Sequence, residues 1–131
     1  MKRRAALALL LGCMACAKRE PAVELFPDSL AGWTRTSLRE LPVAESPDPV
    51  PKESIRRVSA ASYDGQGKVE ARAYELSRQE IGLDIAQRWR PAADTVFFWA
   101  RRYFVVVSWK DADRKALQEF TRALEKRLNA T

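Results

Sequence analysis

Apolar residues are most concentrated between Thr95 and Trp109, where the chain reads TVFFWARRYFVVVSW. Val, Phe, Tyr and Trp favour β-strands, and only Ala100, Arg101 and Arg102 separate two runs of strand length. This pattern predicts a β-hairpin with its turn at those three residues. Because none of the three is suited to a positive φ, the sequence does not determine how the two strands are paired.

A second hairpin is predicted around the sequence Asp64-Gly65-Gln66-Gly67, since glycines accept the positive φ of tight turns. Its strands would run over 55–63 and 69–76. If Tyr63 pairs with Lys68, small side chains from both strands share one face of the hairpin. Such a face suits close packing by a helix, and a slip of one residue would mix the two faces.

Two helices are predicted by apolar residues that recur three or four positions apart. The first begins with a capping box of Ser77 and Glu80 and ends at Arg90-Pro91. The second runs over 112–128, with Asp111 as its cap. Their apolar stripes are Ile81, Ile85 and Trp89 in the first helix, and Leu117, Phe120, Leu124 and Leu128 in the second.

The order of these elements predicts the fold class. A first strand over 33–38 follows Gly32, and the prolines within 42–51 make that segment an extended connector. The result is an α+β fold: an antiparallel sheet of four or five strands with two helices packed on one face. This order resembles the PsbP/Mog1-like α+β sandwiches, and the opening Gly32-Trp33 resembles uncharacterised bacterial lipoprotein families. Neither resemblance implies a particular activity.

The second face of such a sheet needs a cover, because the hairpin at 95–109 is apolar on both faces. We expect the segment over 26–41 to fold across this face. The alternatives are a surface for a partner protein and a groove for an apolar ligand.

The N-terminus, MKRRAALALLLGCMAC, has a basic start, a short apolar run and small residues before a cysteine, which is the layout of a secretory signal. The apolar run is shorter than the roughly 20 residues that span a bilayer as a helix. Leu10-Leu11-Gly12-Cys13 resembles the lipobox of bacterial lipoproteins, and Met14-Ala15-Cys16 fits it less well. The resemblance implies a signal peptide over 1–12, lipidation of Cys13 (alternatively Cys16), a tether over 13–25 and a single domain over 26–131.

Lipidation implies that the protein is held at the membrane of the bacterial cell envelope and faces the periplasm. Two or three acyl chains bind a bilayer stably, whereas one binds it marginally. Neither Met14 nor Ala17 is the Asp that favours inner-membrane retention in this family, which implies the outer membrane. A cleaved signal without lipid and an uncleaved anchor helix remain the alternatives. With Cys13 and Cys16 as the two cysteines, no disulfide is predicted within the domain.

Composition and charge narrow the classes of function. The chain of 131 residues is 47% hydrophobic and predicts one globular domain. Its net charge is +6, but three basic residues lie in the leader, and without them 20 basic residues face 17 acidic ones. This net charge of +3 argues against a nucleic-acid partner.

The residues that most enzymes use are missing. The sequence contains no histidine, which excludes Ser-His-Asp and Cys-His catalysis and removes the commonest metal ligand. It also lacks a phosphate-binding loop, a dinucleotide-binding motif and a G-x-S-x-G motif. We therefore predict no enzyme activity, no cofactor, and neither catalytic nor metal-binding residues.

Arginines interleaved with tryptophans are the remaining candidate for chemistry. Such groups can bind an anionic polymer, a lipid headgroup or a carbohydrate by stacking and charge. Alternatively, the tryptophans fill the core and the arginines prevent the strands from pairing with other chains. The candidate interaction residues are Trp33, Arg88, Trp89, Arg90, Trp99, Arg101 and Arg102.

Together these features predict a membrane-tethered envelope lipoprotein that acts as a non-enzymatic interaction or accessory module. Its predicted partners are the membrane, through the N-terminal acyl chains, and another envelope protein. The alternative is a carrier or sensor of a small apolar ligand, bound between sheet and helices around Trp89, Trp99 and Phe120. An exposed aromatic patch would favour the module, whereas a cavity lined by those three residues would favour the carrier.

Overall fold

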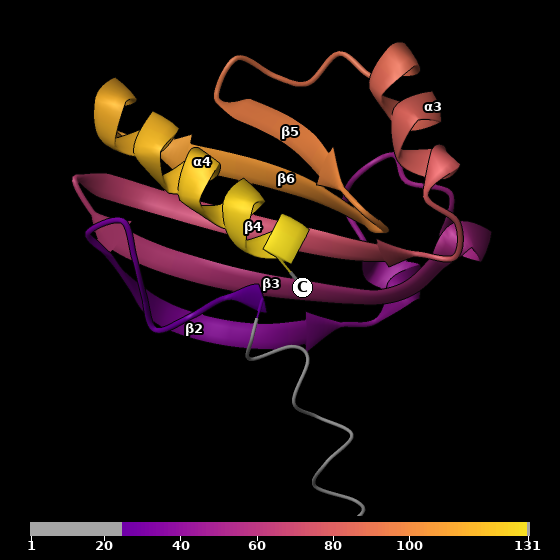
Figure 1. Ribbon diagram of the computed structural model, residues 1–131, viewed down its shortest axis with the longest axis horizontal. Coiled ribbons are helices and arrows are strands. Elements are labelled where there is room, and N and C mark those ends of the chain that lie inside the picture. The colour runs from indigo at the N-terminus through magenta and orange to yellow at the C-terminus, as the bar shows by residue number, and fades with distance from the viewer. Residues whose placement is uncertain (1–24, 131) are drawn as a thin grey trace, which may run out of the picture.

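A curled antiparallel sheet of six strands dominates the structure, a computed structural model that describes residues 25–130 (Figure 1). The strand order is β1-β2-β3-β4-β6-β5, and every pair of neighbours is antiparallel. The leader, Cys13 and Cys16 lie outside the described residues. The elements are β1 (Ser29–Leu30), β2 (Trp33–Leu41), the 3-10 turns η1 (Val43–Glu45) and η2 (Lys52–Ser54), β3 (Ile55–Gly65), β4 (Gly67–Leu76), α3 (Glu80–Arg88), β5 (Thr95–Ala100), β6 (Tyr103–Lys110) and α4 (Arg114–Ala130).

The structure is α+β, but the predicted sheet of four or five strands is wrong, because the sheet has six. The additional strand is β1, which is only two residues long and pairs with β2 across the turn at Ala31-Gly32. Both residues of that turn have a positive φ, of 51° and 87°. Alanine rarely adopts this conformation, so local sequence signals do not indicate a turn that starts at Ala31.

The prediction that both helices pack on one face is also wrong. Val105 and Val107 of β6 belong to the same apolar cluster as Phe120 of α4. Phe104 and Val106 belong to a different cluster, which contains the buried residues of α3. Successive residues of a strand point to opposite faces, so α4 covers the first face of the sheet and α3 covers the second.

The first face carries the larger core, centred on Phe120. Its ring lies edge-on to those of Trp33 and Tyr63, with centroid distances of 5.8 Å and 5.0 Å. The indole Nε1 of Trp33 donates a hydrogen bond to the Ala116 carbonyl at 3.2 Å, and the Tyr63 hydroxyl donates one to the Pro27 carbonyl at 2.7 Å. These bonds satisfy the polar atoms of the two large rings inside the core.

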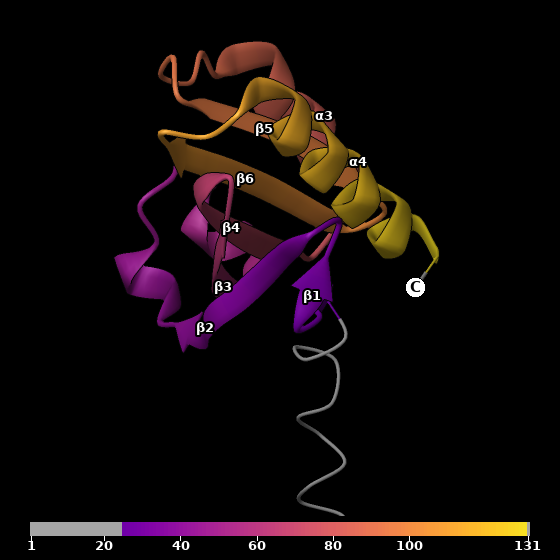
Figure 2. The same ribbon diagram turned by 90° about the vertical axis from the view of Figure 1, so that its left-hand side faces the viewer.

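The expectation that the segment over 26–41 covers the second face is wrong. Phe26 and Trp33 are buried in the first-face core, together with Leu25. The proline-rich segment over 42–54 covers part of the second face instead and places Val50 in the same core as Val58. Figure 2 shows this segment and α4 on opposite sides of the sheet. The predicted connector is therefore also a packing element.

The register of the β3–β4 hairpin differs by one residue from the prediction. Tyr63 pairs with Val69, and Lys68 pairs with Asp64. Gly67 adopts a φ of 122° in the turn between the two strands. Its backbone lies against Ala112, and a Cβ on Gly67 would come within 2.5 Å of the Ala112 Cα. Because the observed register is shifted by one residue from the predicted one, the small side chains of the two strands are divided between the two faces of the hairpin.

Both predicted helices form, although their caps differ from the prediction. Helix α3 starts after Gln79, and no side chain caps it, so the predicted Ser77 cap is wrong. The Ser77 amide bonds instead to the Ser54 carbonyl at 2.9 Å. At α4, the cap is Asp113 and not Asp111: its carboxylate accepts a hydrogen bond from the Ala116 amide at 2.9 Å.

The apolar hairpin is confirmed as β5 and β6, and the structure supplies the register that the sequence left open. Ala100 pairs with Tyr103, which leaves Arg101 and Arg102 as a two-residue turn. Arg101 takes the positive φ, 56°, that such a turn requires.

The buried Tyr63 gives the fold a predictable response to alkali. Burial raises the pKa of Tyr63 to about 12, partly opposed by Arg35 and Arg127. A raised pKa in the folded state stabilises the fold fully below pH 10 and loses that contribution as the pH rises through about 12. We expect the free energy of unfolding, measured with urea at several pH values, to fall over this interval.

The variant Tyr63→Phe is expected to flatten this fall, although it also loses the hydrogen bond to Pro27 and so starts from a lower stability. The pKa of Tyr74 is raised too, by burial and by its hydrogen bond to Asp48, so part of the fall remains. Identical pH profiles for wild type and variant would show that Tyr63 does not titrate in this way.

Candidate functional site

The second face of the sheet changes from apolar to polar along the strands. The strand registers set four rows of side chains across it, from β2 towards β5. Helix α3 and the segment over 42–54 contribute to the apolar core at one end of the face. In order from this end, the rows are Leu41, Val58, Tyr74, Phe104 and Trp99; Arg39, Ala60, Arg72, Val106 and Phe97; Ser37, Ser62, Glu70, Ser108 and Thr95; and Thr34, Asp64, Lys68 and Lys110.

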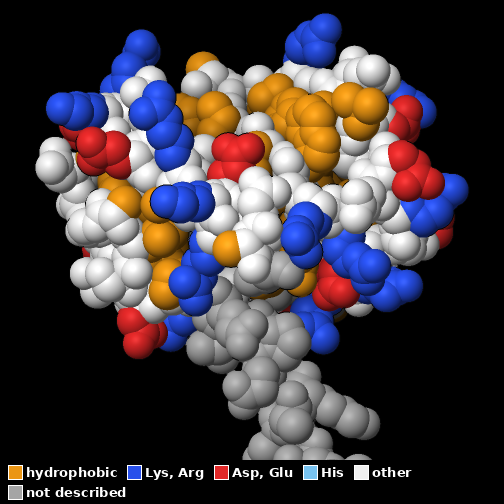
Figure 3. Space-filling view, viewed as in Figure 1, with side chains coloured by type: hydrophobic (Ala, Val, Ile, Leu, Met, Phe, Trp, Pro, Cys, Tyr) orange, Lys and Arg blue, Asp and Glu red, His pale blue; other side chains and the backbone are white. Residues whose placement is uncertain are grey.

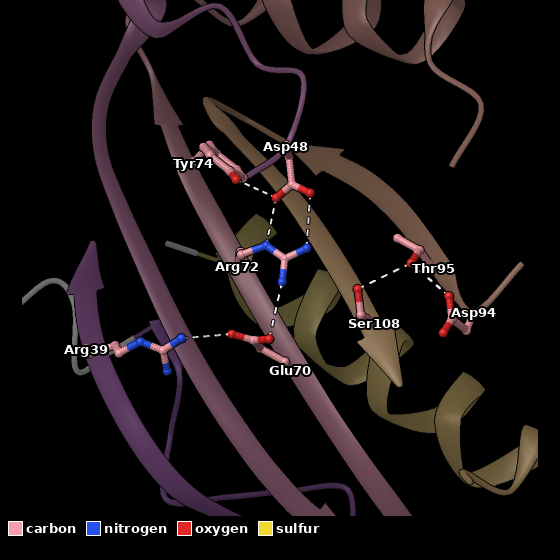
Figure 4. A network of polar contacts seen from close by, with 8 residues as sticks. All are labelled: Arg39, Asp48, Glu70, Arg72, Tyr74, Asp94, Thr95 and Ser108. Carbon is pink, nitrogen blue, oxygen red and sulfur yellow. Dashed lines mark hydrogen bonds and ion pairs between the residues drawn. The ribbon is translucent and has the colours of Figure 1, made fainter. Parts of the chain in front are cut away.

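A buried ion pair marks the boundary between the apolar and polar rows (Figure 4). The guanidinium of Arg72 donates two hydrogen bonds to the carboxylate of Asp48, at 2.7 Å and 3.0 Å. The Tyr74 hydroxyl donates a further one to the same carboxylate. The exposed fractions of the Arg72 and Asp48 side chains are 12% and 7%. We call Asp48, Arg72 and Tyr74 the Asp48 cluster.

The electrostatics of the cluster favour its charged form. Burial opposes the charge on Arg72, but the hydrogen bond and negative charge of Asp48, with help from Glu70, outweigh this effect and raise the pKa of Arg72. The Glu70 carboxylate lies 3.4 Å from the third nitrogen of the Arg72 guanidinium, Nη1, and 3.0 Å from Nη2 of Arg39. Both carboxylates are thus bound to arginine, and neither is placed as a free acid or base.

The cluster holds the proline-rich segment on the sheet. Asp48 comes from that segment, whereas Arg72 and Tyr74 come from β4, so the ion pair joins two elements 24 residues apart. Val50 packs into the second-face core two residues further on. A short proline-rich segment has few backbone hydrogen bonds of its own, and these side chains explain its fixed position.

The polar rows beyond the cluster line an open hollow of about 420 Å³. Thr36, Ser62, Glu70 and Ser108 contribute polar groups to it, and Lys68 lies 3.3 Å from Asp64. The charges of both signs are mostly paired with one another. This polarity explains why half of the second face needs no covering element.

The predicted interaction residues fall into two separate places. Trp33 is buried, with 1% of its surface exposed, and belongs to the first-face core. Trp89 follows α3 and stacks on Phe97, with ring centroids 5.3 Å apart. Arg88 pairs with Asp84 at 2.8 Å, and Arg90 is exposed just after the helix. The alternative interpretation, in which tryptophan fills the core, therefore holds for Trp33.

Trp99, in contrast, reaches the surface at the junction of α3 and β5. Its exposed fraction is 40%, and that of Leu83 on α3 is 48%. The helix approaches Trp99 closely at Gly82, where a Cβ would lie 3.1 Å from the Trp99 Cβ. The structure brings the exposed Arg102 to the end of the same strand. We call Leu83, Trp99 and the turn Arg101-Arg102 the α3–β5 surface.

Figure 3 shows exposed hydrophobic side chains gathered over β5 and beside α3. Among the described residues, the large hydrophobic side chains that are exposed are Leu83, Val96 and Trp99. Leu83 was not among the predicted interaction residues. The signal for it was present, because an apolar residue between Ile81 and Ile85 points away from the stripe that those two form.

The Asp48 cluster was also missed by sequence reasoning. Asp48 sits among prolines in a segment with no periodic pattern, and nothing local indicates which residue it meets. The pairing of Arg72 with Asp48 depends on the β3–β4 register and on the path of the segment over 42–54. Both are set by contacts between residues far apart in the sequence.

The described residues contain no group of three or more Cys, His, Asp or Glu side chains placed to hold a metal ion. Within residues 25–130, no helix has the length and apolar character needed to cross a membrane. Comparisons of the chain with protein-family models, with curated proteins and with solved structures found no match.

Proposed function

We propose that this protein is an acylated lipoprotein of the bacterial envelope and that it binds another envelope protein through the α3–β5 surface. The observation that carries the proposal is the exposure of Trp99 and Leu83, at 40% and 48%, on adjoining elements. Hot spots of protein interfaces are enriched in Trp, Tyr and Arg, and Trp99 with Arg101 and Arg102 fits this composition.

The placement of the α3–β5 surface supports this role. The described chain begins at Leu25, at the lower side of the domain in Figures 1 and 2, whereas α3 and β5 lie at the upper side. The α3–β5 surface therefore lies on the opposite side of the domain from the point at which the described chain begins.

The arginines indicate the charge of the partner. Arg101 and Arg102 follow Trp99 within β5 and its turn, and both are exposed. Arginine binds carboxylates through two parallel hydrogen bonds. We infer that the partner presents acidic side chains around an apolar centre.

The carrier alternative, as predicted from sequence, has less support. Trp89 and Trp99 lie over the second face, whereas Phe120 fills the first-face core between Trp33 and Tyr63. The sheet separates these rings, so they do not line one cavity. A small-ligand site would have to lie elsewhere in the domain.

Affinity capture from the envelope tests the proposal. The acylated protein is expected to recover a discrete partner, and the double variant Leu83→Ser with Trp99→Ser is expected to lose it. Loss of a hot-spot side chain costs 2 kcal/mol or more, which corresponds to roughly 30-fold in affinity for each residue. Val96→Ser is the matched control, because Val96 is exposed on the same strand but points to the first face.

Equal recovery by the wild type and the double variant would contradict a role for the α3–β5 surface. A soluble form that starts before Leu25 separates the two halves of the proposal. If this form recovers the partner from solubilised envelope, binding resides in the domain, and the acyl chains supply only the location. The truncation must retain Leu25, because its side chain is buried in the first-face core.

A further inference from the structure

A hollow of about 480 Å³ lies on the first face, between the β5–β6 hairpin and the first turns of α4. We call it the α4 groove. Its volume falls within the range of small-molecule sites, about 300–1,000 Å³. The α3–β5 surface does not extend into it, because Val96 and Trp99 are on opposite faces of β5. The lining of the α4 groove includes Val96, Trp109, Ala112, Arg114, Leu117 and Gln118.

Polar and apolar atoms line the α4 groove in similar amounts, and its apolar part is incompletely covered. Val96 keeps 38% of its surface exposed, although it sits beside Val107, which is fully buried. Trp109 and Leu117 approach from β6 and α4. The exposed side chain of Val96 lies beside the indole of Trp109 in this lining, so it can bury further apolar area if a ligand enters.

One charged residue, Arg114, belongs to the lining. It is the first residue of α4, whose first turn holds no acidic residue. A positive charge at this end opposes the helix dipole. Arg114 also makes no ion pair with any residue in the described range. The carboxylate that caps α4 belongs to Asp113 and bonds to the Ala116 amide, so the guanidinium of Arg114 can attract an anion into the groove.

We propose that the α4 groove binds a single-chain amphiphile with an anionic head group, of the fatty-acid type. The tail lies against Val96, Trp109 and Leu117, and the head group meets the guanidinium of Arg114. These three side chains supply the apolar part of the lining, and the positive charge of Arg114 favours an anionic head group over a neutral or cationic one. The inference is independent of the α3–β5 surface and of the partner proposed for it.

Calorimetric titration tests this inference with two probes that share one tail, dodecanoate and dodecyltrimethylammonium, each kept below its micelle-forming concentration. The protein is the non-acylated chain from Ala17 to Thr131, which retains every residue of both cores. We expect saturable one-to-one binding of dodecanoate and much weaker binding of the cationic probe. Equal binding of the two probes, or no saturable binding of dodecanoate, would overturn the proposal.

Two variants locate the site. Arg114→Glu is expected to weaken dodecanoate binding about 10- to 100-fold, the effect of losing a hydrogen bond to a charged group. This change places an acid at the start of α4 and favours the helix, so weaker binding would not reflect unfolding. Val96→Trp is expected to fill the α4 groove and abolish binding, with circular dichroism confirming the fold.

Trp99→Ser is the control and is expected to bind dodecanoate like the wild type. If Trp99→Ser abolishes binding while Val96→Trp retains it, the amphiphile binds at the α3–β5 surface and the α4 groove is not its site. The capture experiment tests the α3–β5 surface, which lies on the other face of β5. A titration without dodecanoate binding would therefore not affect the proposal that this surface binds a protein.

Discussion

Replacing Asp48 with alanine is expected to lower the free energy of unfolding by about 3–5 kcal/mol, the range seen when one member of a buried ion pair is removed. The variant leaves Arg72 charged, 12% exposed and without its two hydrogen bonds to the segment over 42–54. It also removes the acceptor of the Tyr74 hydroxyl. Urea unfolding followed by circular dichroism measures the loss.

A paired substitution distinguishes the cost of an orphaned charge from the value of the pair. Arg72→Met in the Asp48→Ala background is expected to recover part of the lost stability, because no buried charge then remains unpaired.

Asp94→Ala is the matched control for Asp48→Ala, since Asp94 is an exposed carboxylate on the same face of the molecule as the cluster in Figure 4. It should change stability by no more than about 0.5 kcal/mol. Equal losses for Asp48→Ala and Asp94→Ala would show that the Asp48 cluster does not hold the segment.

The second large effect is expected at Phe120, where alanine should cost about 3–5 kcal/mol. The Phe120 side chain is fully buried and touches the rings of both Trp33 and Tyr63. Its removal leaves a cavity between α4 and the sheet, and it also deletes two edge-to-face contacts. The measurement is again the free energy of unfolding.

Glu119→Ala provides the control for this prediction. Glu119 precedes Phe120 in the same helix and is exposed, and alanine is the best helix former. We expect the free energy of unfolding of Glu119→Ala to stay within about 0.5 kcal/mol of that of the wild type. A loss below about 1 kcal/mol for Phe120→Ala would mean that α4 contributes little to the core and that the sheet folds largely without it.

The elements that could be predicted from sequence are those whose signals are local. The periodic apolar residues of α3 and α4 and the two β-rich runs at 95–109 identified their elements because each pattern repeats within a few residues. Of the predicted fold class, only the α+β composition followed correctly from their order. The strand count did not, because β1 has only two residues and depends on a positive φ at Ala31.

The distribution of helices over the two faces could not be predicted, because it depends on which of two apolar faces each helix selects. Phe104 and Val105 are both apolar neighbours in β6, yet they belong to different cores. The same limit applies to Trp33 and Trp99, which look alike in sequence although one is buried and the other is 40% exposed. A single sequence contains no record of these long-range choices.

The predicted interaction residues show which part of the α3–β5 surface local sequence signals could identify. The interleaved arginines and tryptophans led to Trp99, Arg101 and Arg102, which the structure places on the α3–β5 surface. They also led to Trp33, which is part of the core. Only exposure separates the two groups, and exposure follows from the assembled fold.

Site-specific photo-crosslinking from position 83 in intact cells tests the proposed role of the α3–β5 surface most directly, since Leu83 is the most exposed of the large hydrophobic residues on the described surface. A photoreactive residue replaces Leu83 in one strain and Arg122, on the outer side of α4, in another. We expect a discrete crosslinked product in the envelope fraction from position 83, absent from position 122 and lost when Trp99 is changed to serine. The same products from both positions, or none from position 83 in membrane-associated protein, would contradict binding through this surface.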